Sequence, residues 1–264
     1  MKVREVVDRI VTACQVPPGD KPCDRLIAGD WDSEVTGVVT TFMATVEVIH
    51  DAIARGANLI IPHEPTYFTG LEPTDWLRDD EVYELKRQLI ERNGINIWRF
   101  HDHMHLTHPD LIYAGLDREL GWEQFALPKL PCYRIPPTTV DELATTLKHK
   151  LGVNLVQIVG NRDAPVERVA LMMGGWSLGF PEQAPMELMR TENLDVAVRG
   201  EILEWTLCAY VRDAAQLGLN KAIIIVGHNR SEEAGMKHLP DWLRPLLPGV
   251  PVQFSEAGEP FVYV

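Results

Sequence analysis

Short apolar runs alternate along this chain with longer segments whose apolar residues recur at helical spacing. The apolar runs span residues 35–42, 57–62, 95–100 and 221–227. Continuous runs of this kind are typical of strands buried on both faces of a parallel sheet. The segment after the first run begins at Thr45, a good N-cap residue, and ends at Gly56, as expected of a helix. The alternation predicts an α/β fold, with helices packed on mostly parallel or mixed sheets.

The composition changes at residues 126–139, where four prolines occur. This stretch predicts a linker or an extended crossing between two α/β domains. Beyond it the alternation resumes, and residues 250–254 and 261–264 are expected to form two last short strands. The glycine-rich segment 173–179 predicts a tight turn that closes near a functional site.

Composition and charge narrow the class of protein. With 264 residues, 45% of them hydrophobic and 24% charged, the chain is expected to be a soluble globular protein. The net charge of −13 disfavours nucleic acid as a partner. The four cysteines show no C-x-x-C spacing, which indicates reduced thiols. The charged, helix-like first fifteen residues do not resemble a secretory signal, and there is no long apolar run, so we expect a cytoplasmic protein with no membrane partner.

Polar residues that can bind metals follow three of the predicted strands. Because the carboxyl ends of parallel strands meet at one edge of a sheet, these residues are expected to converge. Imidazole and carboxylate ligands together suit zinc, iron, manganese or nickel. The residues concerned are His63, Glu64, His101, Asp102, His103, His105, His228 and Glu232.

The cluster at residues 101–108 can be interpreted in more than one way. An extended backbone would place His101, His103 and His105 on one face, with Asp102 on the other as a residue that orients a ligand. His103 is the most ambiguous of the three, and His108 precedes a proline and suits a turn better than a metal. Taken alone, His63 is as compatible with an ordinary loop histidine as with a ligand.

Several blocks of the sequence resemble, in the same order, the GTP cyclohydrolase I type 2 homologue family, whose NGG-interacting-factor-three-like members bind a dinuclear metal centre. The segment 35–68 resembles the family's strand, helix and strand that lead to a His-His-Pro turn and aromatic residues. The block "NIWRFHDHMH" lies where the family has a strand followed by His-Thr-Asn-Leu-Asp. "DVAVRGEI" and "IIIVGHNRSEEAGMKHL" resemble its Asp-x-x-x-Thr-Gly-Glu and Gly-His-x-x-Ser-Glu blocks.

The resemblance implies a discontinuous organisation. Residues 1–128 and 221–264 would form a metal-site domain, and residues 129–220 a second α/β domain. It also implies self-association into a toroidal homohexamer and two divalent transition-metal ions per chain. The ligands that it implies are His63, Glu64, His105, His228 and Glu232, with His101 beside them.

This chain departs from the family at three positions. Glu64 replaces a histidine and His105 replaces an aspartate, so the number of imidazole and carboxylate ligands is retained while their arrangement changes. Arg199 replaces a threonine, and its guanidinium suits either a bound phosphate or carboxylate, or a neighbouring acidic side chain.

Two functions are compatible with these residues. The first is a metal-dependent hydrolase that acts on a small molecule through a metal-activated water, with Glu64, Asp102 or Glu232 as the general base. The alternative is a protein of the same family that handles metal or serves as an interaction scaffold without catalysis. A site open to solvent would favour the first, because structural metal sites are closed.

Overall fold

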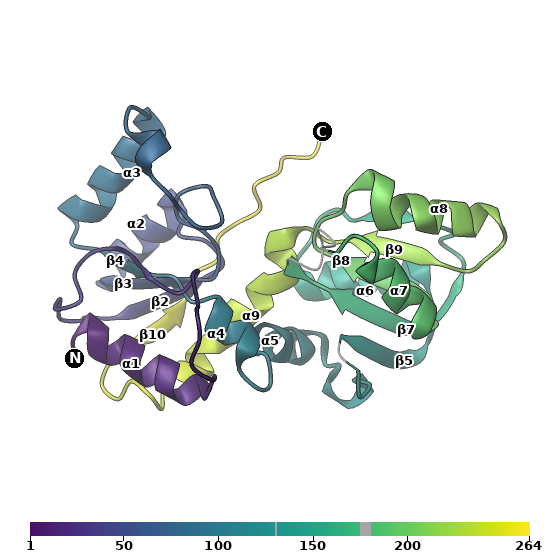
Figure 1. Ribbon diagram of the computed structural model, residues 1–264, viewed down its shortest axis with the longest axis horizontal. Helices are drawn as coiled ribbons and strands as arrows, with labels where there is room; N and C mark the ends of the chain where they lie inside the picture. The colour runs from purple at the N-terminus through teal and green to yellow at the C-terminus, as the bar shows by residue number, and fades with distance from the viewer. Residues whose placement is uncertain (130, 175–180) are drawn as a thin grey trace. The chain divides into compact units, whose positions relative to one another are not determined.

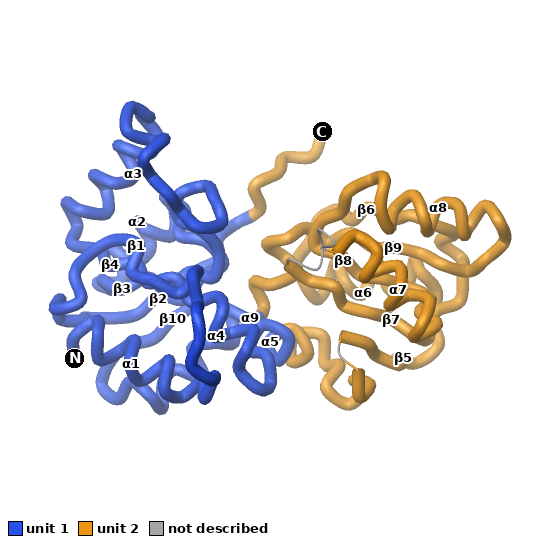
Figure 2. The backbone as a smooth tube through the Cα atoms, in the orientation of Figure 1, with its two compact units in different colours: residues 1–115, 235–258 blue, residues 116–234, 259–264 orange. Residues whose placement is uncertain are grey.

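The chain folds into two compact units, each with its own sheet (Figure 2). The computed structural model describes residues 1–129, 131–174 and 181–264. Unit 1 comprises residues 1–115 and 235–258, and unit 2 comprises residues 116–234 and 259–264. Each unit contains a five-stranded sheet, and helices cover the sheets, so the predicted α/β class is confirmed (Figure 1). Among the described residues, no helix combines the length and apolar character needed to cross a membrane.

The sheet of unit 1 has the strand order β1-β4-β3-β2-β10. Its members are β1 (Leu26–Ala28), β2 (Val38–Thr41), β3 (Leu59–Pro62), β4 (Asn96–Trp98) and β10 (Val252–Phe254). Strands β4, β3, β2 and β10 run parallel to one another, and the edge strand β1 is antiparallel to β4. The carboxyl ends of β2, β3 and β4 therefore lie along one edge of the sheet.

Helices cover both faces of this sheet, which explains the continuous apolar runs. One apolar cluster contains Val38, Leu59 and Ile61, and the other contains Val39 and Ile60 from the same strands. Successive residues of a strand point to opposite faces, so a strand covered on both sides must be apolar at every position. The helices of this unit are α1 (Val3–Cys14), α2 (Val46–Ala54), α3 (Glu81–Arg92), α4 (Asp102–Leu106) and the 3-10 helix η1 (Asp75–Leu77).

Helix α2 begins where the sequence predicts. The Thr45 side chain accepts a hydrogen bond from the Val48 backbone N–H and so satisfies one of the free donors of the first turn. Gly56 follows the helix with a φ of +68°, a conformation that glycine adopts without strain. These local signals fix the direction in which the chain enters β3.

The sheet of unit 2 has the strand order β5-β7-β8-β9-β6. Its members are β5 (Cys132–Thr139), β6 (Gln157–Val159), β7 (Pro165–Met172), β8 (Val196–Arg199) and β9 (Ala222–Ile225). The central strands β7, β8 and β9 are parallel, and the two edge strands are antiparallel to their neighbours. The helices are α6 (Val140–Leu151), α7 (Ala184–Thr191), α8 (Ala209–Gln216), the 3-10 helix η2 (Glu123–Phe125) and the π-helical turn η4 (Glu204–Cys208).

Two helices contribute residues to both units, because the division falls inside α5 (Leu111–Leu120) and α9 (His228–Leu243). The sequence prediction divided the chain after residues 128 and 220 instead. Strand β9 pairs with β8, so residues 222–225 belong to the sheet of unit 2.

Residues 132–139 of the proline-rich segment form strand β5, so this part of the segment is not a linker, which corrects the sequence interpretation for these residues. Strand β5 forms an edge of its sheet, and its pairing with β7 shifts between Arg134 and Thr138. Pro136 and Pro137 lie at this irregularity, where a missing backbone donor interrupts no regular ladder. Residues 261–264, also predicted as a strand, have no regular secondary structure.

Candidate metal centre

The first group of candidate ligands lies at the carboxyl edge of the sheet in unit 1. His63 directly follows β3, and its backbone N–H donates to the Thr41 carbonyl at the end of β2. The Phe100 N–H donates to the Pro62 carbonyl, which holds the chain after β4 beside the chain after β3. The predicted convergence of His63 and His101 is therefore a direct result of parallel strand pairing.

Three imidazole rings meet at this edge. The ring centroid of His63 lies 4.5 Å from that of His101 and 5.0 Å from that of His105, and the last two rings are 4.9 Å apart. One ring nitrogen from each residue lies within 4.8 Å of the other two. Such spacing suits three nitrogen ligands of one metal ion, because each would need to move little to reach a common point.

Each of these rings is oriented by a hydrogen bond at Nδ1. The partners are the Phe100 carbonyl oxygen for His63 (3.2 Å), Asp102 Oδ1 for His101 (2.9 Å) and Asp110 Oδ2 for His105 (2.9 Å). All three partners are acceptors, so Nδ1 of each ring carries a proton, and in the neutral form of each ring Nε2 is the nitrogen that can bind a metal. This arrangement is the one found in metal-binding histidines, whose second nitrogen donates to a carboxylate or a carbonyl.

The environment of His63 keeps its ring neutral. The side chain is fully buried, and this desolvation lowers its pKa well below the usual value, with further lowering from the neighbouring His101 and His105. Only a neutral imidazole can coordinate a metal ion. The buried histidine is thus held in the form that binds metal.

Residues 102–106 form a short helix, α4, and not the extended segment that the sequence suggested. The helix places His105 one turn after His101, so their rings lie on the same side. His103 points elsewhere, and its Nδ1 hydrogen bonds to the Asp24 carboxylate.

Asp24 explains why this segment is helical. Its buried carboxylate accepts hydrogen bonds from three consecutive backbone N–H groups, those of His101, Asp102 and His103. These are donors of the first turn, which an N-cap residue would otherwise satisfy, and the His101 side chain does not cap the helix. Asp24 therefore acts as the N-cap of α4 from a distant part of the sequence.

Glu64 lies beside His101 and is held by an arginine. Its Oε2 accepts a hydrogen bond of 2.9 Å from Arg99 Nη2, and its Oε1 lies 4.0 Å from His101 Nε2. Arg99 is buried, and its Nε donates to the His63 carbonyl. One guanidinium thus fixes the backbone of one candidate ligand and the carboxylate of the next.

Asp102 is hydrogen bonded to His101 and to the backbone of Cys23. Its Oδ1 accepts from His101 Nδ1, and its Oδ2 accepts from the Cys23 backbone N–H at 3.0 Å. Cys23, His101 and Asp102 also form a group with atoms spaced closely enough for a metal. Burial, followed by smaller electrostatic effects, raises the pKa of the Cys23 thiol to about 11, so it remains protonated at neutral pH.

The loop after Glu64 is closed by buried charged groups. Glu72 accepts hydrogen bonds from the backbone N–H groups of Thr66 and Tyr67. Lys86 of α3 donates to the Thr66 carbonyl at 2.8 Å, and burial lowers its pKa from 10.5 to about 8, although Glu72 opposes this effect. Burial of the charged ammonium is therefore a cost to the folded protein at neutral pH.

Lys86→Met is expected to change how stability depends on pH. Between pH 8 and 10.5 the wild-type Lys86 is deprotonated in the folded state but still protonated in the unfolded state, so the unfolded state binds more protons and stability rises with pH. Across this range, the free energy of unfolding of the wild type should rise by about 3 kcal/mol relative to that of the variant. Denaturant unfolding from pH 7.5 to 10.5 measures the difference, with the exposed Lys150→Met as control. If the difference in unfolding free energy between wild type and Lys86→Met did not change with pH, the lowered pKa of Lys86 would be contradicted.

The second group of candidate ligands lies in unit 2. His228, at the start of α9, has its Nε2 3.0 Å from Glu232 Oε2 and its Nδ1 3.2 Å from Glu201 Oε1. Two carboxylates facing one imidazole form a set of nitrogen and oxygen donors that suits a metal ion. Glu232 is buried, and a Cβ at residue 174 would displace its carboxylate; Gly174 also has a φ of +51°, a conformation that glycine adopts most easily. The rest of the predicted 173–179 turn, residues 175–179, lies outside the described part of the chain.

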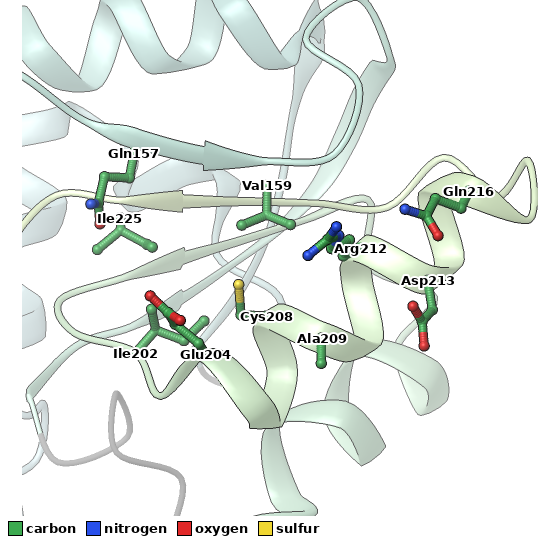
Figure 3. Close-up of a pocket in the computed structure, with 10 residues that line it drawn as sticks. All are labelled: Gln157, Val159, Ile202, Glu204, Cys208, Ala209, Arg212, Asp213, Gln216 and Ile225. Carbon is green, nitrogen blue, oxygen red and sulfur yellow. The ribbon is translucent and has the colours of Figure 1, made fainter.

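Unit 2 has two other notable features. Arg199 is buried in β8, and its Nη1 lies 3.3 Å from Met172 Sδ. A pocket of about 650 Å³ lies between the β6–β9 edge of the sheet and helix α8 (Figure 3). Its lining includes Arg212 and Glu204 but none of the residues predicted for the metal site.

Sequence reasoning identified the residues that meet at the centre but missed those that hold them. His63, Glu64, His101 and His105 come together in unit 1, and His228 and Glu232 come together in unit 2. His108 is exposed. The missed residues are Asp24, Arg99, Asp110 and Glu201. Only Asp110 gave a local signal, because an aspartate before an apolar helical segment is a good N-cap.

Comparison with known proteins identifies relatives along almost the whole chain. A family model described as Duf34/NIF3 (NGG1p interacting factor 3) matches residues 1–260. A relative from Clostridium perfringens, named GTP cyclohydrolase 1 type 2 homolog, is 24% identical over 257 residues, which cover 90% of each protein.

Solved structures show the same fold. A Bacillus cereus protein related to NIF3 matches with a TM-score of 0.79 and 16% identity, over 100% of this chain and 99% of that one. Staphylococcus aureus protein SA1388 matches with a TM-score of 0.73 and 22% identity, over the same shares of the two chains. The two-sheet architecture is therefore shared at low sequence identity.

Proposed function

The chain belongs to the Duf34/NIF3 family, and on this premise we propose that it is a metal-dependent hydrolase of a small molecule. The observation that supports the metal site is the common orientation of three histidines. His63, His101 and His105 each donate from Nδ1 to an acceptor, and one ring nitrogen of each lies within 4.8 Å of one from each of the other two. The fit is chemical as well as geometric, because neutral imidazole nitrogens are preferred ligands of zinc and related metals.

A divalent metal held by these nitrogens would supply a Lewis acid, able to polarise a substrate oxygen and to lower the pKa of a bound water. We infer that Glu64 is the general base that accepts a proton from this water. Its Oε2 is occupied by Arg99, whereas its Oε1 faces His101 at 4.0 Å. Asp102 is less suited to this role, since both of its oxygens already accept hydrogen bonds. It positions His101 instead.

Two further parts of the proposal come from the sequence resemblance. His228 and Glu232 are inferred to supply ligands as well, which would give two metal ions per chain. Their mutual contact in unit 2 is compatible with this role, since a metal ion can replace the proton shared by an imidazole and a carboxylate. The family resemblance also supports self-association into a homohexamer, which light scattering of the purified protein would test.

Metal removal tests the proposed function. Protein purified without a tag or added metal is expected to contain about two equivalents of transition metal per chain by plasma mass spectrometry. The holoprotein should hydrolyse one or more compounds in a panel of phosphoesters, amides and cyclic nucleobases. Treatment with a chelator should abolish that activity, and the original metal should restore it.

Two results would contradict the proposal in different ways. A chain without bound metal would refute the metal centre as a whole. Bound metal without hydrolysis of any compound would refute the catalytic part and favour the alternative, a protein that handles metal or serves as an interaction scaffold. Where hydrolysis is found, Glu64→Gln tests the proton acceptor, because it should reduce hydrolysis at least about 100-fold while His63, His101 and His105 still hold a metal ion.

A further inference from the structure

Phe68 has an unfavourable backbone conformation whose cost is not offset by burial of its side chain. Its φ is +66°, in the left-handed region that bulky aromatic residues rarely adopt. The side chain is 54% exposed, so burial of the ring does not compensate for the strain. Strained residues of this kind are concentrated at binding and catalytic sites, where the surrounding structure imposes the conformation.

The neighbours of Phe68 impose this conformation. Glu72 binds the backbone N–H groups of the two preceding residues, Thr66 and Tyr67, and Tyr67 is buried in the core. Lys86 holds the Thr66 carbonyl, and its ammonium lies 5.6 Å from the centroid of the Phe68 ring. Glu72 has a left-handed backbone as well, with a φ of +50°. The fold thus holds the ring of Phe68 at the surface.

The loop that carries Phe68 is attached to the metal centre. Arg99 Nη1 hydrogen bonds to the Gly70 carbonyl, two residues after Phe68, while Nη2 of the same guanidinium binds Glu64. Glu64 in turn faces His101. The exposed ring is therefore fixed on a short loop whose two ends are joined beside the candidate ligands.

We propose that Phe68 provides a stacking surface for a planar ring of the molecule that binds at the His63–His101–His105 centre. This inference rests on the proposed function and specifies its substrate class: an aromatic or heteroaromatic compound with a metal-binding oxygen or nitrogen next to the ring. Exposed aromatic rings bind such compounds by offset stacking, which contributes a severalfold increase in affinity. Leu71 and Trp76, both largely exposed in the same segment, extend the apolar surface.

Two chelators that differ only in a ring test this inference. Benzohydroxamate and acetohydroxamate share the metal-binding group, but the first carries a phenyl ring where the second carries a methyl group. Calorimetric titration of the zinc-loaded protein should give a preference for benzohydroxamate. In Phe68→Ala this preference should fall by about threefold to tenfold, whereas acetohydroxamate should bind as in the wild type. Phe68→Trp retains an aromatic surface and should retain the preference.

Controls separate stacking from a change in folding. Trp31→Ala removes another exposed aromatic residue of unit 1 and should leave the preference unchanged. Trp31 follows Asp30, whose backbone N–H binds the Asn96 side chain at the end of β4 opposite to His101. Phe68→Gly should be no less stable than wild type, because glycine adopts this φ freely. An unchanged preference in Phe68→Ala, with normal zinc binding, would overturn this inference alone. A wild type that binds neither zinc nor acetohydroxamate would overturn the proposed function and the inference with it.

Discussion

Replacing His105 with alanine is expected to lower the affinity for zinc by at least about 100-fold, because loss of the residues that merely orient a ligand already costs 10-fold to 100-fold. His105 supplies one of three converging ring nitrogens, and its side chain is 30% exposed, so its removal leaves no large cavity in the core. Competition with a chromophoric chelator measures the affinity, and metal analysis of the purified variant measures the content.

Two further variants make this result specific. His50→Ala removes an exposed histidine of α2 and should leave zinc binding unchanged. Asp110→Asn removes the negative charge, and its one carbonyl oxygen can still cap α5, but its NH2 group then faces His105 Nδ1 in place of the acceptor Oδ2. Its effect on affinity is expected to be smaller, about 10-fold, with unchanged unfolding. Equal zinc affinity in His105→Ala and wild type would exclude His105 as a ligand.

Asp24→Ala is expected to destabilise the protein by about 3 kcal/mol and to weaken zinc binding, because several buried donors would lose a charged acceptor. Asp24 binds three backbone N–H groups at the start of α4 and the His103 ring. Without it, the first turn of α4 should fray, and the helical spacing that brings His105 beside His101 should be lost.

Denaturant unfolding and zinc competition on the same samples test both parts of this prediction. Asp24→Asn can still accept hydrogen bonds and should be less destabilised than Asp24→Ala. Asp20→Ala changes an exposed aspartate only four residues away and should resemble the wild type in both measurements. If Asp24→Ala retained normal zinc affinity, α4 would not depend on this cap to position its histidines.

The elements that could be predicted from the sequence are those with strong local signals. The apolar runs of β2, β3 and β9 are recognisable because helices cover both faces of each sheet. Helix α2 has an N-cap and a terminal glycine that each act over a few residues. Strand β5 was missed because its prolines usually signal a loop, and only its place at the edge of a sheet makes them compatible with a strand.

The same distinction applies to the candidate site. Parallel pairing of β3 and β4 made it predictable that His63 and His101 would meet. The extended conformation expected for residues 101–105 was wrong, because the signal for a helix comes from Asp24, 77 residues before His101 in the sequence. A cap supplied from so far away leaves no local pattern near the helix that it stabilises.

By itself, the sequence determined the α/β class, the family and the residue types that gather at the strand ends, because all three depend on patterns within short segments. Three features follow from the tertiary structure alone: which acceptor each imidazole N–H meets, the contact of His103 with Asp24, and the hydrogen bond from Arg99 to Glu64. These features depend on contacts between residues far apart in the chain, and such contacts exist only after the sheet and its helices have packed.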